Sequence, residues 1–424
     1  MAAIISPASI LGSQSPRLKA LPPLSLYIHI PWCLKKCPYC DFNSHEVRGG
    51  DSGIPEDEYI SALIHDLEAA LPNIWGRSIA SIFLGGGTPS LLSAQSIDTL
   101  LTAVRTLLPL EHFAEITMEA NPGTFEAKKF ADFRAAGINR LSIGIQSFNP
   151  GHLRKLGRVH NDLEAYRAVD IALKNFDNVN LDLMYALPGQ TLEEARSDIE
   201  TACTLGVSHI SAYHLTLEPN TLFHRYPPPL PDDELSASMQ ATIEQLAADS
   251  RYINYEISAF AQPGRESRHN MNYWLFGDYL GIGAGAHSKI SFVDKIVRQM
   301  RFKQPKEYLA KAGRMNTIED PPIQTQHELD RADRGFEFMM NALRLTAGFE
   351  TEIFYERTGL PITTVQQPLM EAERRELILR DHQRIVPTMK GRRFLNDLLQ
   401  IFLPEEKANR EMVISYLENS AKPQ

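Results

Sequence analysis

The sequence predicts an α/β protein in which a partial (β/α)6 barrel precedes a small helical, winged-helix-like C-terminal domain. After Leu24, short β-branched runs alternate six times with segments of helical periodicity, a pattern that favours a parallel sheet covered by helices. Six such units form either an open sheet or an incomplete barrel. Residues suited to chemistry follow the ends of successive strands, which is the edge where α/β proteins bind ligands, and this placement favours the barrel.

The first part of the chain supplies the six repeated units. The expected strands are Leu24–Ile30, Ile79–Leu84, Glu115–Glu119, Arg140–Gly144, Val179–Met184 and His209–Leu215. The helices expected between them are Glu56–Leu71, Ser93–Leu108, Glu126–Ala136, Leu163–Phe176 and Leu192–Leu205. A break at Pro227–Pro231 precedes one more helix, Asp232–Asp249, and a strand, Tyr252–Ile257. The glycine-rich segment from Gly264 to Ser288 is expected to be irregular.

The second part begins after a linker expected at Pro321 and Pro322. The expected helices there are Leu329–Leu345, Thr351–Thr358 and Thr363–Glu376, and strands are expected at Leu377–Pro387 and Arg392–Leu395 before a last helix. We expect four regions: a flexible tail (1–23), the barrel (24–304), the C-terminal domain (305–404) and a final helix or tail (405–424).

Composition excludes several classes of function. The 424 residues are 43% hydrophobic and 22% charged, as in soluble globular domains. The 43 Lys and Arg against 52 Asp and Glu give a net charge of −9, which makes nucleic acid an unfavourable partner. No run of 18 apolar residues predicts a membrane span, and the first 23 residues lack the basic start of a signal peptide. Four cysteines are too few for a disulfide framework, so we expect a cytoplasmic protein.

Three cysteines carry the strongest chemical signal. Cys33, Cys37 and Cys40 form C-x3-C-x2-C directly after the first expected strand. Thiolates at this spacing can bind three irons of a [4Fe–4S] cluster and leave the fourth iron open. Zinc is the competing metal, but a structural zinc site needs four protein ligands and usually a second paired motif, which the sequence lacks. Cys203 is expected to be a small buried hydrophobic residue at a helix end.

An open iron needs a chelating ligand, and S-adenosylmethionine has an amino and a carboxylate group that can serve. The run Gly85-Gly86-Gly87-Thr88-Pro89 exposes backbone groups one βα unit after the cysteines. Glu119, at the end of the third expected strand, could pair with a ribose hydroxyl or an ammonium group. The cysteine spacing resembles that of the radical S-adenosylmethionine superfamily.

Further motifs resemble one family within it, the oxygen-independent coproporphyrinogen oxidase family, from about Leu24 to Leu395. The motifs that carry the resemblance are YIHIPWC, CPYCDF, GGGTPS, MEANPGT, SIGIQSF, LGRVH, DLMYALPGQ and GIGAGAHS. The resemblance implies an electron donor for the cluster and S-adenosylmethionine contacts from Tyr27, Tyr39, Gly86, Glu119 and the vicinity of Ala286. It also implies that Gly87, Thr88, Gln146, Arg158, Asp182 and the vicinity of His214 line an adjoining site, which holds a second S-adenosylmethionine in the oxidase.

The sequence departs from the oxidase branch at two places. The oxidases carry a fourth cysteine where this chain has Phe42, and only 26 residues precede Tyr27, so the N-terminal region that surrounds the oxidase's substrate is missing. Asp41-Phe42 after the third cysteine resembles the heme chaperone branch of the family. The signature H-N-x-x-Y-W of that branch is present as His269, Asn270, Tyr273 and Trp274.

This signature predicts a heme site. An imidazole of His269 can ligate heme iron, and Tyr273 and Trp274 offer flat apolar faces. Arg265 and Arg268 could pair with the heme propionates. The alternative is that Tyr273 and Trp274 pack into the barrel mouth while His269 caps a loop. We expect His29, His45, His214 and His287 to be structural, although each could serve as a ligand.

The sequence therefore favours a cytoplasmic protein that binds a [4Fe–4S] cluster, S-adenosylmethionine and heme, and that transfers heme to acceptor proteins. The second hypothesis is oxygen-independent conversion of coproporphyrinogen III to protoporphyrinogen IX, and the third is a radical enzyme with another substrate. A homodimer and a peripheral contact with a membrane are left open.

Overall fold

The computed structural model describes residues 17–47, 53–123, 127–313 and 320–404. The expected N-terminal tail lies mostly outside these residues, although Leu18 is buried and its N–H donates to the carbonyl of Val293. The expected final helix or tail at 405–424 lies wholly outside them. Among the described residues, no helix is long and apolar enough to cross a membrane.

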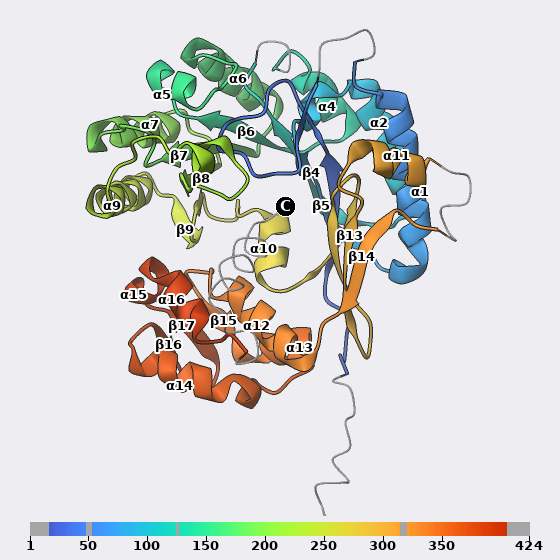
Figure 1. Cartoon of the computed structure of the whole chain (residues 1–424), viewed down its shortest axis with the longest axis vertical. Helices are drawn as coiled ribbons and strands as arrows, with labels where there is room; N and C mark the ends of the chain where they lie inside the picture. The colour runs from blue at the N-terminus through green and yellow to red at the C-terminus, as the bar shows by residue number, and fades with distance from the viewer. Residues whose placement is uncertain (1–16, 48–52, 124–126, 314–319, 405–424) are drawn as a thin grey trace, which may run out of the picture.

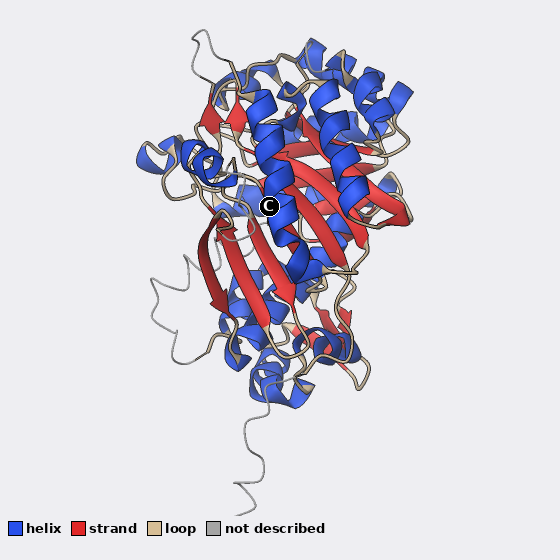
Figure 2. Ribbon diagram, turned by 90° about the vertical axis from the view of Figure 1, so that its right-hand side faces the viewer, coloured by secondary structure: helices blue, strands red, loops and turns tan. Residues whose placement is uncertain are grey.

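Six parallel strands form the centre of the molecule (Figures 1 and 2). They are β1 (Leu24–Ile30), β4 (Ile79–Gly86), β5 (Leu110–Ala120), β6 (Arg140–Gln146), β7 (Val179–Tyr185) and β8 (His209–His214). Neighbours in the sheet are also neighbours in the sequence, and every adjacent pair is parallel. This consecutive order is that of a barrel rather than of a doubly wound open sheet. The predicted fold class is confirmed.

Both edges of the six-stranded core are extended, which leaves the barrel incomplete. On the β1 side the added strands are β11 (Asp278–Ile282), β12 (His287–Ser291), β13 (Ile296–Arg301) and β14 (Ile323–Glu328), of which only β11 is parallel to its inner neighbour. On the β8 side they are β10 (Ala259–Ala261) and β9 (Ile253–Glu256).

Helices cover the outer face of the sheet (Figure 2). The main ones are α1 (Glu56–Ile74), α2 (Ala94–Leu107), α4 (Phe130–Ala136), α6 (Asp162–Asn175), α7 (Leu192–Thr204) and α9 (Asp233–Asp249). Other helices in this part of the chain are η2 (Pro89–Leu91), α5 (Pro150–Lys155), α8 (Leu222–Arg225), α10 (Arg268–Trp274) and α11 (Pro305–Ala312). Side-chain hydrogen bonds fix where two of these helices begin. Asn161 before α6 and Thr191 before α7 each form a capping box, which satisfies backbone donors that have no partner within the helix.

The strands alternate between an apolar and a polar face. In β6, Leu141, Ile143 and Ile145 are fully buried in the core beneath the helices, whereas Arg140 and Ser142 belong to the wall of a cavity inside the barrel. Because successive side chains point to opposite faces of a strand, one sequence builds both the core and the interior site.

The C-terminal domain lies below the barrel in the view of Figure 1. Its residues form a second hydrophobic core, to which Phe276 and Ile296 of the preceding domain also belong. Its elements are α12 (Arg331–Ala342), β15 (Phe349–Glu350), α13 (Thr351–Thr358), η3 (Ile362–Val365), α14 (Gln366–Arg374), β16 (Ile378–Arg380), β17 (Arg384–Pro387), α15 (Met389–Arg393) and α16 (Leu395–Gln400). Phe338 lies at the centre, with its ring centroid 5.0 Å from those of Phe349 and Phe354.

Three expectations need correction. Gly264–Ser288 is not irregular, since it contains α10, β11 and the start of β12. Leu377–Pro387 is a hairpin rather than one strand, and Arg392–Leu395 is helical because the Thr388 hydroxyl caps α15 at the Gly391 N–H. Finally, α11 packs on α1 and β14 pairs with β13, so we propose that the domain boundary lies at 328/329 rather than at 304/305.

Candidate functional site

The three cysteines lie on a loop that leaves β1 and is closed on itself. Its short strands β2 (Trp32–Cys33) and β3 (His45–Glu46) pair with each other. The Lys36 ammonium donates to the carbonyls of Phe42 at 3.1 Å and Ser44 at 3.2 Å. These bonds fix the path of the loop without any metal.

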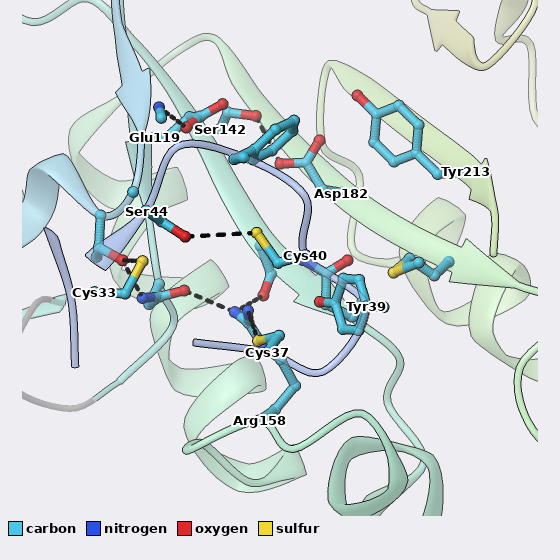
Figure 3. A pocket seen from close by; sticks show the side chains of 18 of the residues that line it. Cys33, Cys37, Tyr39, Cys40, Ser44, Glu119, Ser142, Arg158, Asp182 and Tyr213 are labelled. Atoms are coloured by element: carbon cyan, nitrogen blue, oxygen red, sulfur yellow. Dashed lines mark hydrogen bonds between the residues drawn. The ribbon is translucent and has the colours of Figure 1, made fainter. Parts of the chain in front are cut away.

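Each thiol has a polar neighbour (Figure 3). The Thr88 hydroxyl donates to Cys33 Sγ at 3.5 Å, Arg158 donates to Cys37 Sγ at 3.6 Å, and the Ser44 hydroxyl is 3.7 Å from Cys40 Sγ. Burial raises the pKa of the Cys40 thiol to about 11, against the effect of its hydrogen bonds. A positively charged metal centre would favour the thiolate forms, and the donors around the sulfurs would then stabilise them.

The arrangement fits a cluster better than a single ion. Within the described ranges, no three His, Cys, Asp or Glu side chains gather closely enough to hold one metal ion. In an iron–sulfur cube, by contrast, each thiolate binds a different iron. All three thiols border one cavity. Cys203 is half-buried at the end of α7, packs against the barrel core, and is not among the residues that line this cavity.

That cavity, of about 350 Å³, lies inside the barrel between the cysteine loop and the strand ends. It brings together nine of the residues predicted to bind cofactor. These are Tyr39, Gly86, Gly87, Thr88, Glu119, Gln146, Arg158, Asp182 and His214. They come from the loop after β1, from β4, β5, β6, β7 and β8, and from the segments that follow β4 and α5, so the strand-end pattern in the sequence corresponds to one site.

The glycine run holds the cysteine loop as well as exposing backbone. The N–H groups of Gly87 and Thr88 donate to the carbonyls of Ile30 and Trp32, each at 2.7 Å. A Cβ on Gly87 would lie 2.5 Å from the Trp32 carbonyl oxygen. Any side chain there would separate the loop from the sheet. Gly86, at φ +105°, adopts a conformation that favours glycine and donates its N–H to Glu119 at 3.0 Å.

Two carboxyl groups give the cavity its electrostatic character. Burial and the nearby charge of Asp182 raise the pKa of Glu119 to about 8, although the Gly86 N–H opposes the rise. Burial also raises the pKa of Asp182, against hydrogen bonds from Ser142 at 2.8 Å and Asn180 at 2.9 Å. Carboxyl groups in this state favour a cationic ligand, because a positive charge would stabilise both ionised forms.

Arg158 is the other fixed charge beside the thiols. Besides Cys37, its guanidinium donates to Asn121 Oδ1 at 2.7 Å and to the Gly144 carbonyl at 2.8 Å. These bonds lock the side chain between the cysteine loop and β6. The arrangement leaves Arg158 as a rigid donor to sulfur rather than a mobile surface charge.

Two predicted residues lie behind the cavity wall. Tyr27 and Ala286 pack with Phe83 in a small buried cluster, and only Phe83 reaches the cavity. The Tyr27 hydroxyl is 3.0 Å from His29 Nδ1, and His29 Nε2 is 2.9 Å from the Asn43 carbonyl. His29 is therefore a buried, hydrogen-bonded residue, as expected.

The residues predicted to bind heme are spread around α10. His269 is 5% exposed, lies 3.1 Å from the Ser81 hydroxyl through Nδ1, and packs against Phe83 with ring centroids 5.0 Å apart. Asn270 borders the cavity, whereas Tyr273 and Trp274 pack against Tyr279 and Leu345. The two arginines lie on the surface. Arg265 is exposed, and Arg268 pairs with Glu111 at 3.0 Å.

Several cavity residues were not singled out from the sequence. They are polar or aromatic residues on inward-facing positions: Asn121, Arg140, Ser142, Asn180, Ser211 and Tyr213. The sequence of β6 contains a signal for some of them. Arg140, Ser142 and Gln146 lie on one face of the strand, and the residues between them on the other face are apolar.

Known proteins show similarity over nearly the whole chain. The model of the radical SAM superfamily matches residues 27–202, and that of the HemN C-terminal domain matches 329–394. The heme chaperone HemW of Escherichia coli (strain K12) is 46% identical over 392 residues, which cover 91% of this chain and 99% of that protein. The chain belongs to the HemW family. HemW of Bacillus subtilis (strain 168) is 34% identical over 388 residues, 90% of this chain and 99% of that protein.

A solved structure supports the fold of this HemW family member. The coproporphyrinogen III oxidase HemN from Escherichia coli, a radical SAM enzyme, superposes with a TM-score of 0.75 at 24% identity and covers 90% of each chain. This likeness shows that the two proteins share the barrel and the C-terminal domain. Membership of the radical SAM superfamily implies a [4Fe–4S] cluster and S-adenosylmethionine, in agreement with the cavity chemistry.

Proposed function

We propose that this protein is a cytoplasmic heme chaperone that holds a [4Fe–4S] cluster and S-adenosylmethionine in the barrel, binds heme and passes it to acceptor proteins. The observation that carries the proposal is the 46% identity with a heme chaperone over 91% of the chain. The cavity supports the part of the proposal that concerns the cluster and S-adenosylmethionine, since its cysteines, glycines and carboxyl groups suit these two cofactors of the superfamily.

The residues of the cavity have separable roles in this proposal. Cys33, Cys37 and Cys40 hold the cluster, and Arg158 orients the Cys37 sulfur. Glu119 and Asp182 hold the cationic part of S-adenosylmethionine, and Tyr39, Gly86, Gly87, Thr88, Gln146 and His214 complete the wall. Tyr27 and Ala286 support Phe83 from behind. When bound, the two cofactors supply one-electron chemistry, for which a separate electron donor is required.

Phe42 argues against the oxidase. It replaces the fourth cysteine and is 44% exposed at the cavity rim, where Leu34 (49%), Val159 (53%) and Tyr213 (37%) are also exposed. The similarity to the oxidase structure supports the fold and not the reaction. We therefore expect no decarboxylation of coproporphyrinogen III.

For heme itself we propose the residues around α10. Burial and the charge of Arg140 lower the pKa of His269 to about 3, which keeps the imidazole neutral, as iron ligation requires. Asn270, Tyr273 and Trp274 are the other residues of the proposed heme site, and Arg265 and Arg268 remain the proposed partners of the propionates. Because His269 is 5% exposed, α10 has to shift before iron can reach it.

A heme titration of the anaerobically reconstituted protein, followed by absorbance in the Soret region, tests this. We expect His269→Ala to shift the Soret band and weaken binding, whereas Arg268→Ala weakens binding with little spectral change. His112→Ala, an exposed histidine on β5, is the matched control and leaves both unchanged. If His269→Ala matched the wild type in affinity and spectrum, the ligand assignment would pass to His45, His214 or His287.

A further inference from the structure

The short helix α10 contacts both the cavity and the C-terminal domain. Asn270 lines the cavity, and His269 packs behind the cavity residue Phe83. At the other end of the helix, Trp274 lies in a cluster with Leu345, and the Arg344 guanidinium is 4.5 Å from the centre of its ring. Figure 1 shows α10 between the barrel and α12. A shift of α10 would therefore change contacts both at the cavity and in the C-terminal domain.

One buried carboxylate fixes the start of this helix. Glu115, on β5, accepts hydrogen bonds from the N–H of Arg268 at 3.2 Å, from the N–H of His269 at 3.2 Å and from the Ser267 hydroxyl at 3.4 Å. A negative charge at a helix N-terminus is favourable, because it satisfies donors that have no partner within the helix. Glu115 thus positions the backbone of the predicted heme ligand.

The counter-ion of Glu115 belongs to the cavity wall. Arg140 is 2% exposed and lines the cavity, and its Nε lies 3.9 Å from Glu115 Oε2. Across the described part of the chain, this is its single ion pair, and its buried Nε has no hydrogen-bond partner. Asp182 lines the same cavity as Arg140, and the charge of Arg140 opposes the rise that burial causes in the pKa of Asp182. Arg140 therefore pairs with the carboxylate that holds α10 and borders the cavity in which Asp182 faces the ligand.

We propose that Glu115 and Arg140 are positioning residues that couple S-adenosylmethionine in the cavity to heme binding at α10, so that each ligand weakens the other. This inference rests on the proposed heme site. A cation held by Glu119 and Asp182 neutralises the negative charge of Asp182 in place of Arg140. Arg140 is then free to pair closely with Glu115. A stronger pair holds α10 in place and keeps His269 against Ser81 and Phe83, the conformation in which heme cannot reach it.

Heme titrations with and without saturating S-adenosylmethionine test the coupling. In the anaerobically reconstituted wild type, S-adenosylmethionine should raise the apparent Kd for heme at least about fivefold, within the usual range for coupled sites. In Arg140→Gln the two Kd values should coincide, and Arg140→Lys, which keeps the charge, should restore part of the difference. Arg196→Gln, a half-exposed arginine on α7, is the matched control and should retain the full effect.

A second readout covers the case in which Arg140→Gln does not fold. Amide hydrogen exchange at residues 267–274 of the wild type should slow when S-adenosylmethionine is added, because the helix start is held more tightly. The coupling would be overturned if exchange at these residues did not change, or if the wild-type Kd for heme were the same with and without S-adenosylmethionine. Either result would leave the chaperone proposal intact. Failure of the wild type to bind heme at all would overturn both.

Discussion

Replacing Glu119 by Gln should stabilise the ligand-free protein, and the gain should grow with pH. The pKa of this carboxyl is raised from 4.5 to about 8, chiefly by burial and then by the charge of Asp182. Between these two values the folded protein keeps a proton that the unfolded chain releases. Stability therefore falls as the pH rises through this window, and no further loss from Glu119 follows above about pH 8.

The interval between the two pKa values sets the size of the effect. At about 1.4 kcal/mol per pH unit, the rise from 4.5 to about 8 corresponds to at most about 5 kcal/mol. Because the side chain borders the cavity, solvent screens its charge, and we expect roughly half of that, about 2.5 kcal/mol. Gln is nearly isosteric, and its amide oxygen can still accept the Gly86 N–H that now donates to Glu119 at 3.0 Å.

The assay is urea denaturation of wild type and Glu119→Gln without S-adenosylmethionine at pH 5 and at pH 8.5. We expect similar stabilities at pH 5 and a more stable variant at pH 8.5. Glu58→Gln, on the exposed side of α1, is the control for the Glu-to-Gln substitution itself. A variant that is equally or less stable than the wild type at pH 8.5 would refute the electrostatic description of the cavity.

Three further predictions follow from the cluster, the rim and the core. Cys37→Ser should lose bound iron and sulfide in elemental analysis while Cys203→Ser keeps them, and an intact cluster in Cys37→Ser would reject the ligand set. Phe42→Cys should not confer conversion of coproporphyrinogen III, and product in a chromatographic assay with reductant would contradict this. Burial raises the pKa of Asp278, but the charges of Lys289 and Arg77 lower it by more. Asp278→Asn should therefore cost about 3–5 kcal/mol of stability in urea denaturation, because it leaves the buried Lys289 unpaired. A loss of stability below about 1 kcal/mol would contradict this prediction.

The bounds of helices and strands were predicted most accurately where the hydrophobic periodicity and the residues at the ends of the element agree. The strand Leu24–Ile30 and the helix Thr351–Thr358 have the expected bounds. The strand alternates aliphatic residues with Ser25, Tyr27 and His29, and the helix ends at Gly359 in a left-handed conformation. The segment Gly264–Ser288 was misjudged because β11 and β12 place Asp278 and Lys289 inside the protein, where they pair at 2.8 Å. A buried ion pair between two strands cannot be seen in a hydrophobic pattern.

In the candidate site, too, some residues could be located from the sequence and others only from the structure. Spacing alone located the cysteines, and the position of motifs at strand ends located most of the cavity wall. Arg140 starts β6 and Glu115 lies in the middle of β5, away from those motifs, so their roles depend on how α10 folds back beneath the barrel. The sequence marked His269 as a chemical residue, but only the structure shows that it is buried against Ser81 in this conformation.

A protein that passes heme directly to an acceptor differs from one that merely releases heme in how the transfer rate depends on the acceptor. Heme-loaded protein is mixed with increasing amounts of an apo heme protein from the same cell, and the shift of the Soret band is followed in time. A chaperone that contacts its acceptor should transfer heme at a rate that rises with acceptor concentration and exceeds its release to apomyoglobin. A rate that is the same for every acceptor and independent of concentration would mean passive dissociation and would contradict direct transfer to the acceptor.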